Sequence, residues 1–506
     1  DAALWYVADD VRVNLRELEA AAAQFDREIS VRVRARFAPS LTVPGRITIL
    51  NADIPGLGGY FSSADALPEA AFKFSNERVM MVMNGNADIQ GQSYQATLAH
   101  EYHHLVSWLE DPTEETWISE GMAELAARML NLPAIPYAYF FRRPDVSLAN
   151  WPEDTAQSLS AYAGSSLFSL YLAKRTGVGN IHHLTSQPLD GADGVDAYLR
   201  ELGTGITFDA LFADWLVANL VDADGGRYAY PGSPGSVDVM QTLRVGGTRS
   251  VTVGQLAGAY VRIEANDGPV SVAFDGVEHT PALPVAAHSG DSCWWSNRGD
   301  LIDSMLTGTF KLEAQSHPKL SYSIWHEIEN GWDFAYVQIS TDEGLTWHIL
   351  ESQNMSDGGP QNMFGSTYTG NSNGWLRETI DLSEYAGHDV LLRFEYITDE
   401  SIHGSGLCLD DITIEGGRHG NQLEGAEHTS STWIPRGFVR LPRELPQDYM
   451  ITVIDPDLPH ASYNVPITPN KSVSHVLHTN KGVVLVTALM NVTMQPATFE
   501  LMVSEE

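Results

Sequence analysis

The chain has 506 residues, 43% of them hydrophobic and 9% aromatic, which suits several globular domains rather than a disordered acidic chain. Its 65 acidic residues outnumber its 30 Lys and Arg and give a formal net charge of −35, which opposes binding to nucleic acids and to anionic membrane surfaces. The longest apolar runs, such as Val483 to Met490, have the length of a strand, so no membrane-spanning segment is predicted.

The first part of the chain alternates helical and strand-like patterns. Helices are predicted over 14–26, 93–109, 117–131, 161–175 and 208–220, with Ser93 as the cap of the second. Strands are predicted over 29–37 and 46–51, and the glycine-rich stretch 56–61 is typical of a turn. The Gly- and Pro-rich stretch 225–235 is then expected to be a linker.

From about residue 246 onward, short runs of period-two alternation are separated by Gly, Asn and Asp. This pattern is typical of an antiparallel β-sandwich. Two cysteines, Cys293 and Cys408, lie in this part and allow at most one internal disulfide. If they pair, the long loop that they close contributes roughly 4 to 5 kcal/mol in the chain-entropy model.

The predicted helix over 93–109 contains HExxH as His100-Glu101-Tyr102-His103-His104. Residues four apart share one face of a helix, so His100 and His104 can offer two imidazoles to one Zn²⁺, with Glu101 beside the water. His103 is an alternative ligand, but its spacing from Glu101 is less suitable. The motif therefore predicts a zinc site with Glu101 as general base.

A third ligand is expected on the next helix, in the segment WISEGMAELAA. Glu120 and Glu124 lie four apart on one face, so Glu120 can bind the metal while Glu124 accepts a hydrogen bond from a ligand histidine. The alternative is that both are solvated helix charges. Glu110, six residues after His104, is a rival third ligand in a metzincin-like pattern, although Ser107 replaces the turn glycine of that pattern.

HEYHH followed by WISEGMAE resembles the gluzincin metallopeptidases, which include the thermolysin group, the zinc aminopeptidases and the hyicolysin-type peptidases. The resemblance implies that His100, His104 and Glu120 bind zinc, with Glu101 as base and Glu124 behind the ligands. SAYAGSSLFSLYL is similar to the aminopeptidase segment whose Tyr stabilises the oxyanion, which indicates Tyr162. The GxMEN motif that anchors a free N-terminus is absent from the sequence, which favours an endopeptidase.

A second resemblance covers about 292–416, through CWWSNRGDLIDSMLTGTF, GWDFAYVQISTDEGLTW, DLSEYAGHDVLLRFEYITD and GLCLDDITI. These segments are similar to the MAM-like sandwich of immune inhibitor A peptidases. The similarity does not extend to that family's catalytic pattern, whose third ligand is a His where this chain has WISEGMAE. Acidic turns in the module, at Asp300, Asp303, Asp410 and Asp411, are candidate Ca²⁺ ligands, the alternative being ordinary turn and strand-end acids.

The predicted fold class is a multidomain chain with an α+β zincin-like metallopeptidase domain followed by all-β sandwich modules of the jelly-roll or MAM-like kind. The predicted domains are 1–245 with a helical subdomain at about 115–222, a small β segment at 246–290 that can pair with the last module, 291–417, and 418–506. Gly59, Tyr60 and Phe61 are expected to pair with an extended peptide substrate by strand addition.

The predicted function is a zinc-dependent endopeptidase acting on protein or peptide substrates, with β modules that bind substrate or cell-surface components. Two alternatives remain: a zinc aminopeptidase, and a surface- or glycan-binding protein whose zincin domain is vestigial. The chain starts at Asp1 with no charged-then-apolar leader before it, so we expect a processed, secreted protein.

Overall fold

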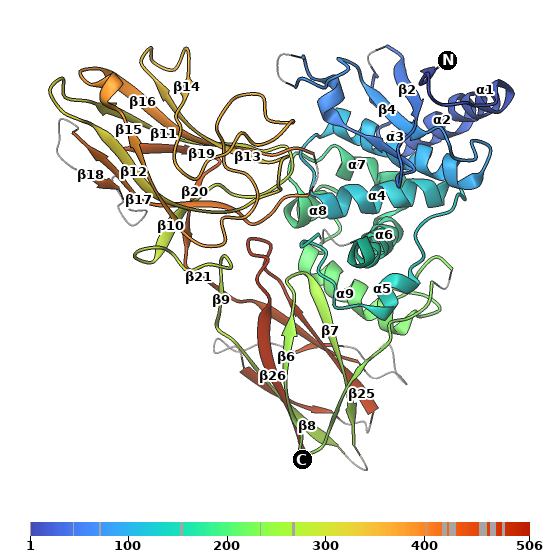
Figure 1. Cartoon of the computed structure of the whole chain (residues 1–506). Helices are drawn as coiled ribbons and strands as arrows, with labels where there is room; N and C mark the ends of the chain where they lie inside the picture. Colours follow the sequence, from blue (N-terminus) through green and yellow to red (C-terminus); the bar gives the residue numbers. More distant parts are fainter. Residues whose placement is uncertain are drawn as a thin grey trace. The chain divides into compact units, whose positions relative to one another are not determined.

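The computed structural model describes residues 2–43, 45–69, 72–151, 155–232, 234–265, 269–400, 402–416, 422–424, 432–454, 463–465, 472–477 and 481–505. The chain divides into two compact units (Figure 1). Unit 1 comprises residues 1–66, 77–280 and 446–506, and unit 2 comprises 67–76 and 281–445. The helical N-terminal part followed by a β-rich part confirms the coarse prediction of a multidomain α+β and β chain.

Unit 1 begins with a four-stranded mixed sheet. Its strands, in spatial order, are β1 (Ala3–Val7), β2 (Ile47–Ala52), β4 (Met80–Asn84) and β3 (Gly59–Phe61). β1, β2 and β4 are parallel, whereas β3 is antiparallel to β4 and lies at the edge. Residues 59–61 of the predicted turn are therefore an edge strand, with the turn before it.

Helices surround this sheet and continue beyond it. They are α1 (Leu15–Gln24), α2 (Ser30–Phe37), α3 (Gln92–Glu110), α4 (Thr116–Met129), α5 (Ala138–Arg142), α6 (Thr155–Thr176), α7 (His182–Thr185), α8 (Gly191–Glu201) and α9 (Phe208–Val221). A π-helical turn over Phe25–Ile29 joins α1 to α2, and short 3₁₀ turns lie at Ser63–Ala66 and Val178–Asn180. None of the described helices is long and apolar enough to cross a membrane.

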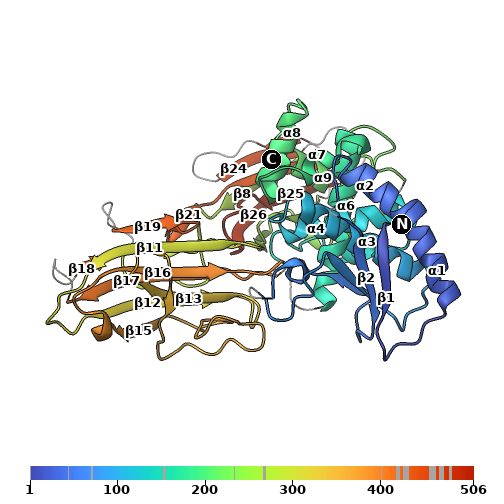
Figure 2. The same cartoon turned by 90° about the horizontal axis from the view of Figure 1, so that it is seen from above.

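The strand predicted over 29–37 is wrong, because this segment is helical and lies beside the sheet (Figure 1, Figure 2). Its apolar residues alternate, but Phe25, Ile29, Val33 and Phe37 also recur every four positions, and all four are buried. A four-residue repeat is that of a helix face, and burial of that face decides between the two periods. Ser93 is likewise not the cap of α3, since Gly91 is the N-cap and Ser93 lies inside the first turn.

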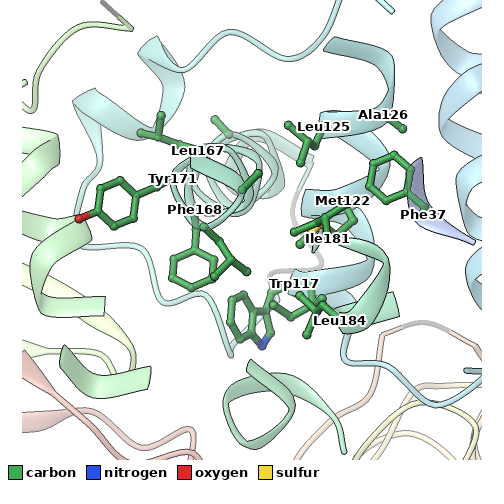
Figure 3. Close-up of a cluster of buried hydrophobic side chains, with 14 of the residues drawn as sticks. Phe37, Trp117, Met122, Leu125, Ala126, Leu167, Phe168, Tyr171, Ile181 and Leu184 are labelled. Atoms are coloured by element: carbon green, nitrogen blue, oxygen red, sulfur yellow. The ribbon is translucent and has the colours of Figure 1, made fainter. Parts of the chain in front are cut away.

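The core of unit 1 fixes α4 against α6. Figure 3 shows Trp117 of α4 next to Phe168 of α6, and both belong with Met122 and Leu167 to one buried cluster. The Trp117 ring packs edge-on against Phe168 with ring centroids 5.3 Å apart. Burial of such large side chains contributes about 1.5 to 3 kcal/mol each, so this contact holds the two helices in one register.

Unit 1 also contains a β-sandwich assembled from two distant parts of the sequence. One sheet has the order β23 (Tyr463–Val465), β22 (Tyr449–Ile454), β25 (Lys481–Ala488), β7 (Ala257–Glu264) and β5 (Gln241–Arg244). The other has the order β24 (Ser472–Leu477), β8 (Val270–Gly276), β26 (Ala497–Glu505) and β6 (Thr248–Val253). The Tyr260 hydroxyl donates to the carbonyl of Leu216 in α9 at 2.8 Å, which ties this sandwich to the helices.

Unit 2 is a sandwich of two antiparallel sheets. The first has the order β15 (Leu376–Asp381), β12 (Lys319–Glu327), β17 (Gly406–Glu415), β10 (Ser292–Trp295) and β20 (Val439–Pro442), with β18 (Gln422–Glu424) also on β17. The second has the order β14 (His348–Ile349), β13 (Phe334–Ser340), β16 (Asp389–Ile397), β11 (Asp303–Lys311) and β19 (Trp433–Arg436). A 3₁₀ turn lies at Ser383–Tyr385, and β9 (His279–Pro281) pairs with β21 (Glu444–Pro446) where the chain enters and leaves this unit.

The disulfide of the chain joins the neighbouring strands β10 and β17. Cys293 and Cys408 are both buried, their sulfurs are bonded, and their Cα atoms lie 5.8 Å apart. The core between the two sheets is formed by apolar residues from both, including Leu306, Tyr322 and Phe394. The disulfide therefore stabilises the first sheet from the side opposite to this core, where Trp325 covers it.

Candidate metal centre

His100 and His104 come from the middle of α3 and face the same way. One helical turn separates them, so their ring centroids lie 4.8 Å apart and their Nε2 atoms 3.1 Å apart. α3 is held in place by the buried Leu98 and Leu105 on its other side. The geometry of the helix thus brings the two imidazoles together.

Glu120 reaches the two histidines from α4. Its Oε2 lies 3.1 Å from Nε2 of His100 and 3.4 Å from Nε2 of His104. The next residue, Gly121, lets α4 approach α6 closely, because a Cβ at this position would meet the Ser165 carbonyl oxygen at 2.6 Å. The tryptophan, glutamate and glycine of the WISEGMAE segment therefore have separate roles in packing, in the contact with the two histidines and in helix approach.

The three atoms form a nearly equilateral triangle with edges of 3.1, 3.1 and 3.4 Å. Tetrahedral zinc with bonds of about 2.0 to 2.1 Å has ligand atoms roughly 3.3 to 3.4 Å apart. His100, His104 and Glu120 are one of two groups of described residues whose ligand atoms all lie within 4.8 Å of one another. Two nitrogens and one oxygen at these separations fit a divalent zinc ion with a fourth position open.

Electrostatics within the triangle are strongly coupled. Burial alone lowers the pKa of His100, but its hydrogen bonds with Glu120 and Glu124 outweigh burial and hold that pKa well above its usual range. Burial would raise the pKa of Glu120, yet the charge of His104 and the hydrogen bond from His100 lower it far below its usual range. The Glu120 carboxylate is thus anionic, and it favours positive charge on the neighbouring rings.

The far nitrogen of each ring has its own partner. Nδ1 of His100 lies 3.4 Å from Oε1 of Glu124, and Nδ1 of His104 lies 3.0 Å from Oγ of Ser119. The Glu124 carboxylate can only accept, so it holds an N–H on Nδ1 of His100, whereas the Ser119 hydroxyl can accept from Nδ1 of His104 or donate to it. Glu124 therefore lies on the far side of His100 from the triangle. Ser119 was missed, although its place directly before Glu120 was a signal in the sequence.

Glu101 lies next to the triangle and faces the edge of the sheet. Its Oε2 accepts a hydrogen bond of 3.0 Å from the backbone N–H of Phe61. Burial raises the pKa of Glu101, while the charges of His100 and His104 oppose that rise. A buried carboxylate that is held by a backbone N–H and has a raised pKa is suited to accept a proton.

Tyr162 of α6 lies beside the triangle and lines the same cleft as His100 and Glu101. Its ring centroid is 6.5 Å from that of His100, and its hydroxyl interacts with Glu120. The charge of Glu120, followed by burial, raises the pKa of Tyr162 well above its ordinary value, so the hydroxyl stays protonated. Trp151 packs edge-on against the Tyr162 ring at 4.8 Å between centroids and was not foreseen from the sequence.

The two rival ligands lie elsewhere. His103 is buried, packs edge-on against Phe37 at 4.6 Å, and neither ring nitrogen has a hydrogen-bond partner among the described residues. Glu110 is the last residue of α3 and belongs to neither group of close ligand atoms in the described part of the chain. Helix geometry separates both from the face that carries His100 and His104.

The edge strand β3 presents alternate backbone groups outward. The Gly58 carbonyl accepts the Asn84 N–H at 2.9 Å, so this pair is hydrogen-bonded toward β4. Bonded and non-bonded pairs alternate in an antiparallel ladder, so Tyr60 is also bonded toward β4, whereas Gly59 and Phe61 direct their backbone groups outward. Glu101 takes the Phe61 N–H, and Gly59 lines the cleft beside His100.

The four predicted calcium ligands have protein partners. His403 lies 2.7 Å from Asp300, and His288 lies 3.0 Å from Asp411. Asp410 accepts the Ser289 N–H at 2.8 Å, and Asp303 begins β11. The other close acidic group among the described residues consists of three further side chains, Glu329, Asp333 and Asp399. Calcium at the four predicted positions stays a prediction.

Comparisons with known proteins concern most of unit 2 and the short stretch of unit 1 that precedes it. Residues 263–442 match the family model described as the immune inhibitor A-like MAM domain. The pre-pro-metalloprotease PrtV of Vibrio cholerae is 30% identical over 142 residues, which are 28% of this chain and 15% of that protein. Immune inhibitor A of Bacillus thuringiensis is 30% identical over 131 residues, 25% of this chain and 18% of that protein.

Bacillopeptidase F of Bacillus subtilis is 26% identical over 136 residues, which are 26% of this chain and 8% of that protein. The matches thus span less than a fifth of the length of each of these relatives. They support the predicted MAM-like domain and a relation to peptidases at the level of this domain.

Proposed function

We propose that this chain is a zinc-dependent endopeptidase whose site is formed by His100, His104, Glu120, Glu101 and Tyr162. The observation that carries the proposal is the triangle of two Nε2 atoms and one carboxylate oxygen with edges of 3.1 to 3.4 Å, beside a buried carboxylate. The metalloprotease and immune inhibitor A names of the relatives agree with it, through the accessory domain.

Bound zinc would supply a Lewis acid that polarises a peptide carbonyl and favours ionisation of a water molecule. Glu101 accepts the proton of that water as it attacks and delivers it to the departing amine. Tyr162 donates its hydroxyl hydrogen to the oxygen that becomes negative. The outward backbone groups of Gly59 hold the substrate main chain along β3, as an added strand.

We further propose the domain limits 1–245, 246–290, 291–417 and 418–506, with the β modules engaging substrate or cell-surface components, and a secreted location. Burial of the disulfide between Cys293 and Cys408 supports secretion, since such bonds persist in oxidising compartments.

Substitution of the base tests the proposal. E101Q keeps the shape of the side chain but removes the proton acceptor, so we expect retained zinc and a loss of proteolysis of about 10² to 10⁴-fold. Zinc is counted by elemental analysis after dialysis, and digestion of an unfolded protein is followed with sequencing of the product ends. Wild-type activity in E101Q, or a wild-type chain that holds no zinc, would contradict the proposal.

The product ends also separate the proposal from an aminopeptidase. An endopeptidase cleaves unfolded proteins whose N-termini are blocked and produces internal ends. An aminopeptidase spares those proteins and releases single residues from free N-termini.

A further inference from the structure

A second cavity of unit 1, of about 240 Å³, lies between α2, the end of α4 and the 3₁₀ turn at Val178–Asn180. It is separate from the candidate metal centre, since none of the residues that line it belongs to that centre. Phe37 of this cavity packs against His103, which lies on another face of α3 than His100 and His104. A ligand bound here would therefore occupy a site of its own.

The floor of the cavity is apolar. Val33 and Phe37 lie four apart on one face of α2, and Ala126 and Leu130 lie four apart at the end of α4. All four residues are buried, and their side chains carry no polar atom. A ligand group that covers this floor removes apolar surface from water, so the floor favours a hydrocarbon group.

The charge at the rim of the cavity is positive. Among the described residues that line it, Arg32 and Arg36 are the charged ones. Backbone carbonyls fix both guanidinium groups, since Nη2 of Arg32 donates to Met129 at 2.6 Å and Nη1 of Arg36 donates to Val178 at 3.0 Å. Both cations are thus held at the edge of the apolar floor, in a chain whose formal net charge is −35.

The two arginines differ in the charge that is left to them. Arg32 lies 3.1 Å from the carboxylate of Glu28, whereas Arg36 forms no ion pair in the part of the chain that the structure describes. A guanidinium has five N–H donors, and a planar carboxylate can accept two of them in parallel. Arg36 therefore keeps both the charge and the donors that a carboxylate requires.

The carbonyls at the end of α4 do not leave a competing acceptor in the cavity. A helix C-terminus carries partial negative charge, which opposes an anion. The carbonyls of Ala127 and Arg128 accept N–H groups of the following residues, and that of Met129 accepts from Arg32. The two guanidinium groups thus determine which charge the cavity attracts.

We propose that this cavity binds a carboxylate that carries a short apolar group, with the carboxylate at Arg36 and Arg32 and the apolar group on the floor of Val33 and Phe37. The C-terminal residue of a peptide and a short fatty acid both have this chemistry. The volume is below the roughly 300 Å³ at which pockets for drug-sized ligands begin, so it suits a ligand of this small size. The inference does not depend on the proposed peptidase function.

Calorimetry of the full chain tests the proposal with two acids and their uncharged amides. Acetyl-leucine is compared with acetyl-leucine amide, and hexanoate with hexanamide. We expect at least one acid to bind about tenfold or more tightly than its amide, and its binding to weaken as salt is added. The acid that binds more tightly identifies the source, a peptide end or a fatty acid. Acids that bind no better than their amides would overturn the proposal.

Three variants locate the binding. R36Q removes the cation without a carboxylate partner, and we expect about tenfold or more weaker binding of the acid. A35E adds a carboxylate at the exposed Ala35 on the rim and keeps both arginines, so it should weaken binding similarly even if R36Q fails to fold. R27Q is the control, because Arg27 also donates to a backbone carbonyl but does not line the cavity. Acid binding that persists unchanged in A35E, as binding at the metal centre would, overturns the proposal.

Discussion

Nδ1 of each histidine is the ring nitrogen that points away from the triangle, and it contacts a different kind of group in the two residues. His104 meets the neutral hydroxyl of Ser119, whereas His100 meets the carboxylate of Glu124. A carboxylate raises the basicity of the ring more than a hydroxyl does, because it stabilises positive charge on the imidazole. In the proposed zinc centre, Glu124 would therefore increase metal affinity as well as orient His100.

Replacing Glu124 tests this role. E124Q must either give up the hydrogen bond from the Ile135 N–H or turn an NH₂ toward His100, so we expect metal affinity to fall about 10 to 100-fold while the chain stays folded. Affinity is measured by competition with a chelator, and circular dichroism reports the fold. E110Q is the matched control on α3 and should bind metal as the wild type does; loss of metal in E110Q instead would reverse the choice of third ligand.

A second prediction at the level of single residues concerns Tyr162. Y162F removes the hydroxyl that we place at the developing negative charge, so we expect kcat to fall about 10² to 10³-fold with little change in KM. W151F keeps an aromatic ring against Tyr162 and should retain most of the activity. Steady-state kinetics on one peptide substrate distinguish the two variants, and an equal loss in both would assign Tyr162 to packing alone.

Among the elements, α4 must meet two requirements at once. It supplies Ser119, Glu120 and Glu124 to the candidate site, and its backbone lies very close to α6. Gly121 allows that approach, and the same approach brings Tyr162 of α6 to Glu120. α3 approaches β3 with similar closeness, because a Cβ on Gly59 would lie 3.0 Å from Thr97. The site depends on small residues where elements meet as well as on its polar side chains.

A methyl group on Gly121 should disturb this arrangement. G121A places a Cβ 2.6 Å from the Ser165 carbonyl oxygen and 2.6 Å from Oγ of Ser169, so we expect a loss of stability of about 1 to 3 kcal/mol and reduced activity. Urea unfolding measures the stability. G179A is the control, because a Cβ there meets nothing within 4 Å, and it should unfold like the wild type.

In the whole molecule, the polypeptide chain passes between unit 1 and unit 2 more than once. Unit 1 takes its sandwich strands from both sides of unit 2 along the chain, since β8 before it pairs with β24 and β26 after it. Unit 2 is stabilised within itself by its core and by the disulfide, which spans 115 residues. Each unit thus has its own source of stability.

The double variant C293S/C408S tests that separation. A loop of this length contributes at most about 4 to 5 kcal/mol in the chain-entropy model, so we expect the unfolding transition of unit 2 to move to lower temperature. Zinc binding and the transition of unit 1 should stay as in the wild type. Calorimetry of the full chain records both transitions, and an unchanged scan, or loss of zinc, would contradict the assignment of the bond to unit 2 alone.

Much of the candidate site follows from short-range periodicity in the sequence. The four-residue spacing of His100 and His104, and of Glu120 and Glu124, places each pair on one helix face, because a helix repeats every 3.6 residues. The MAM-like segments likewise predicted a sandwich in the later part of the chain. Over 29–37, both the two-residue repeat of a strand and the four-residue repeat of a helix face fit the sequence, which was therefore ambiguous. The segment is helical because the helix buries its apolar face beside the sheet.

Contacts between distant segments were decided only by the tertiary structure. The bond from the Phe61 N–H to Glu101 spans 40 residues, and no local pattern marks it. The segment 133–136 is next to α4 in sequence, yet it lines one cleft together with residues of β3 and α3. Periodicity determines which face a side chain takes on its own element, whereas packing between elements determines what that face meets.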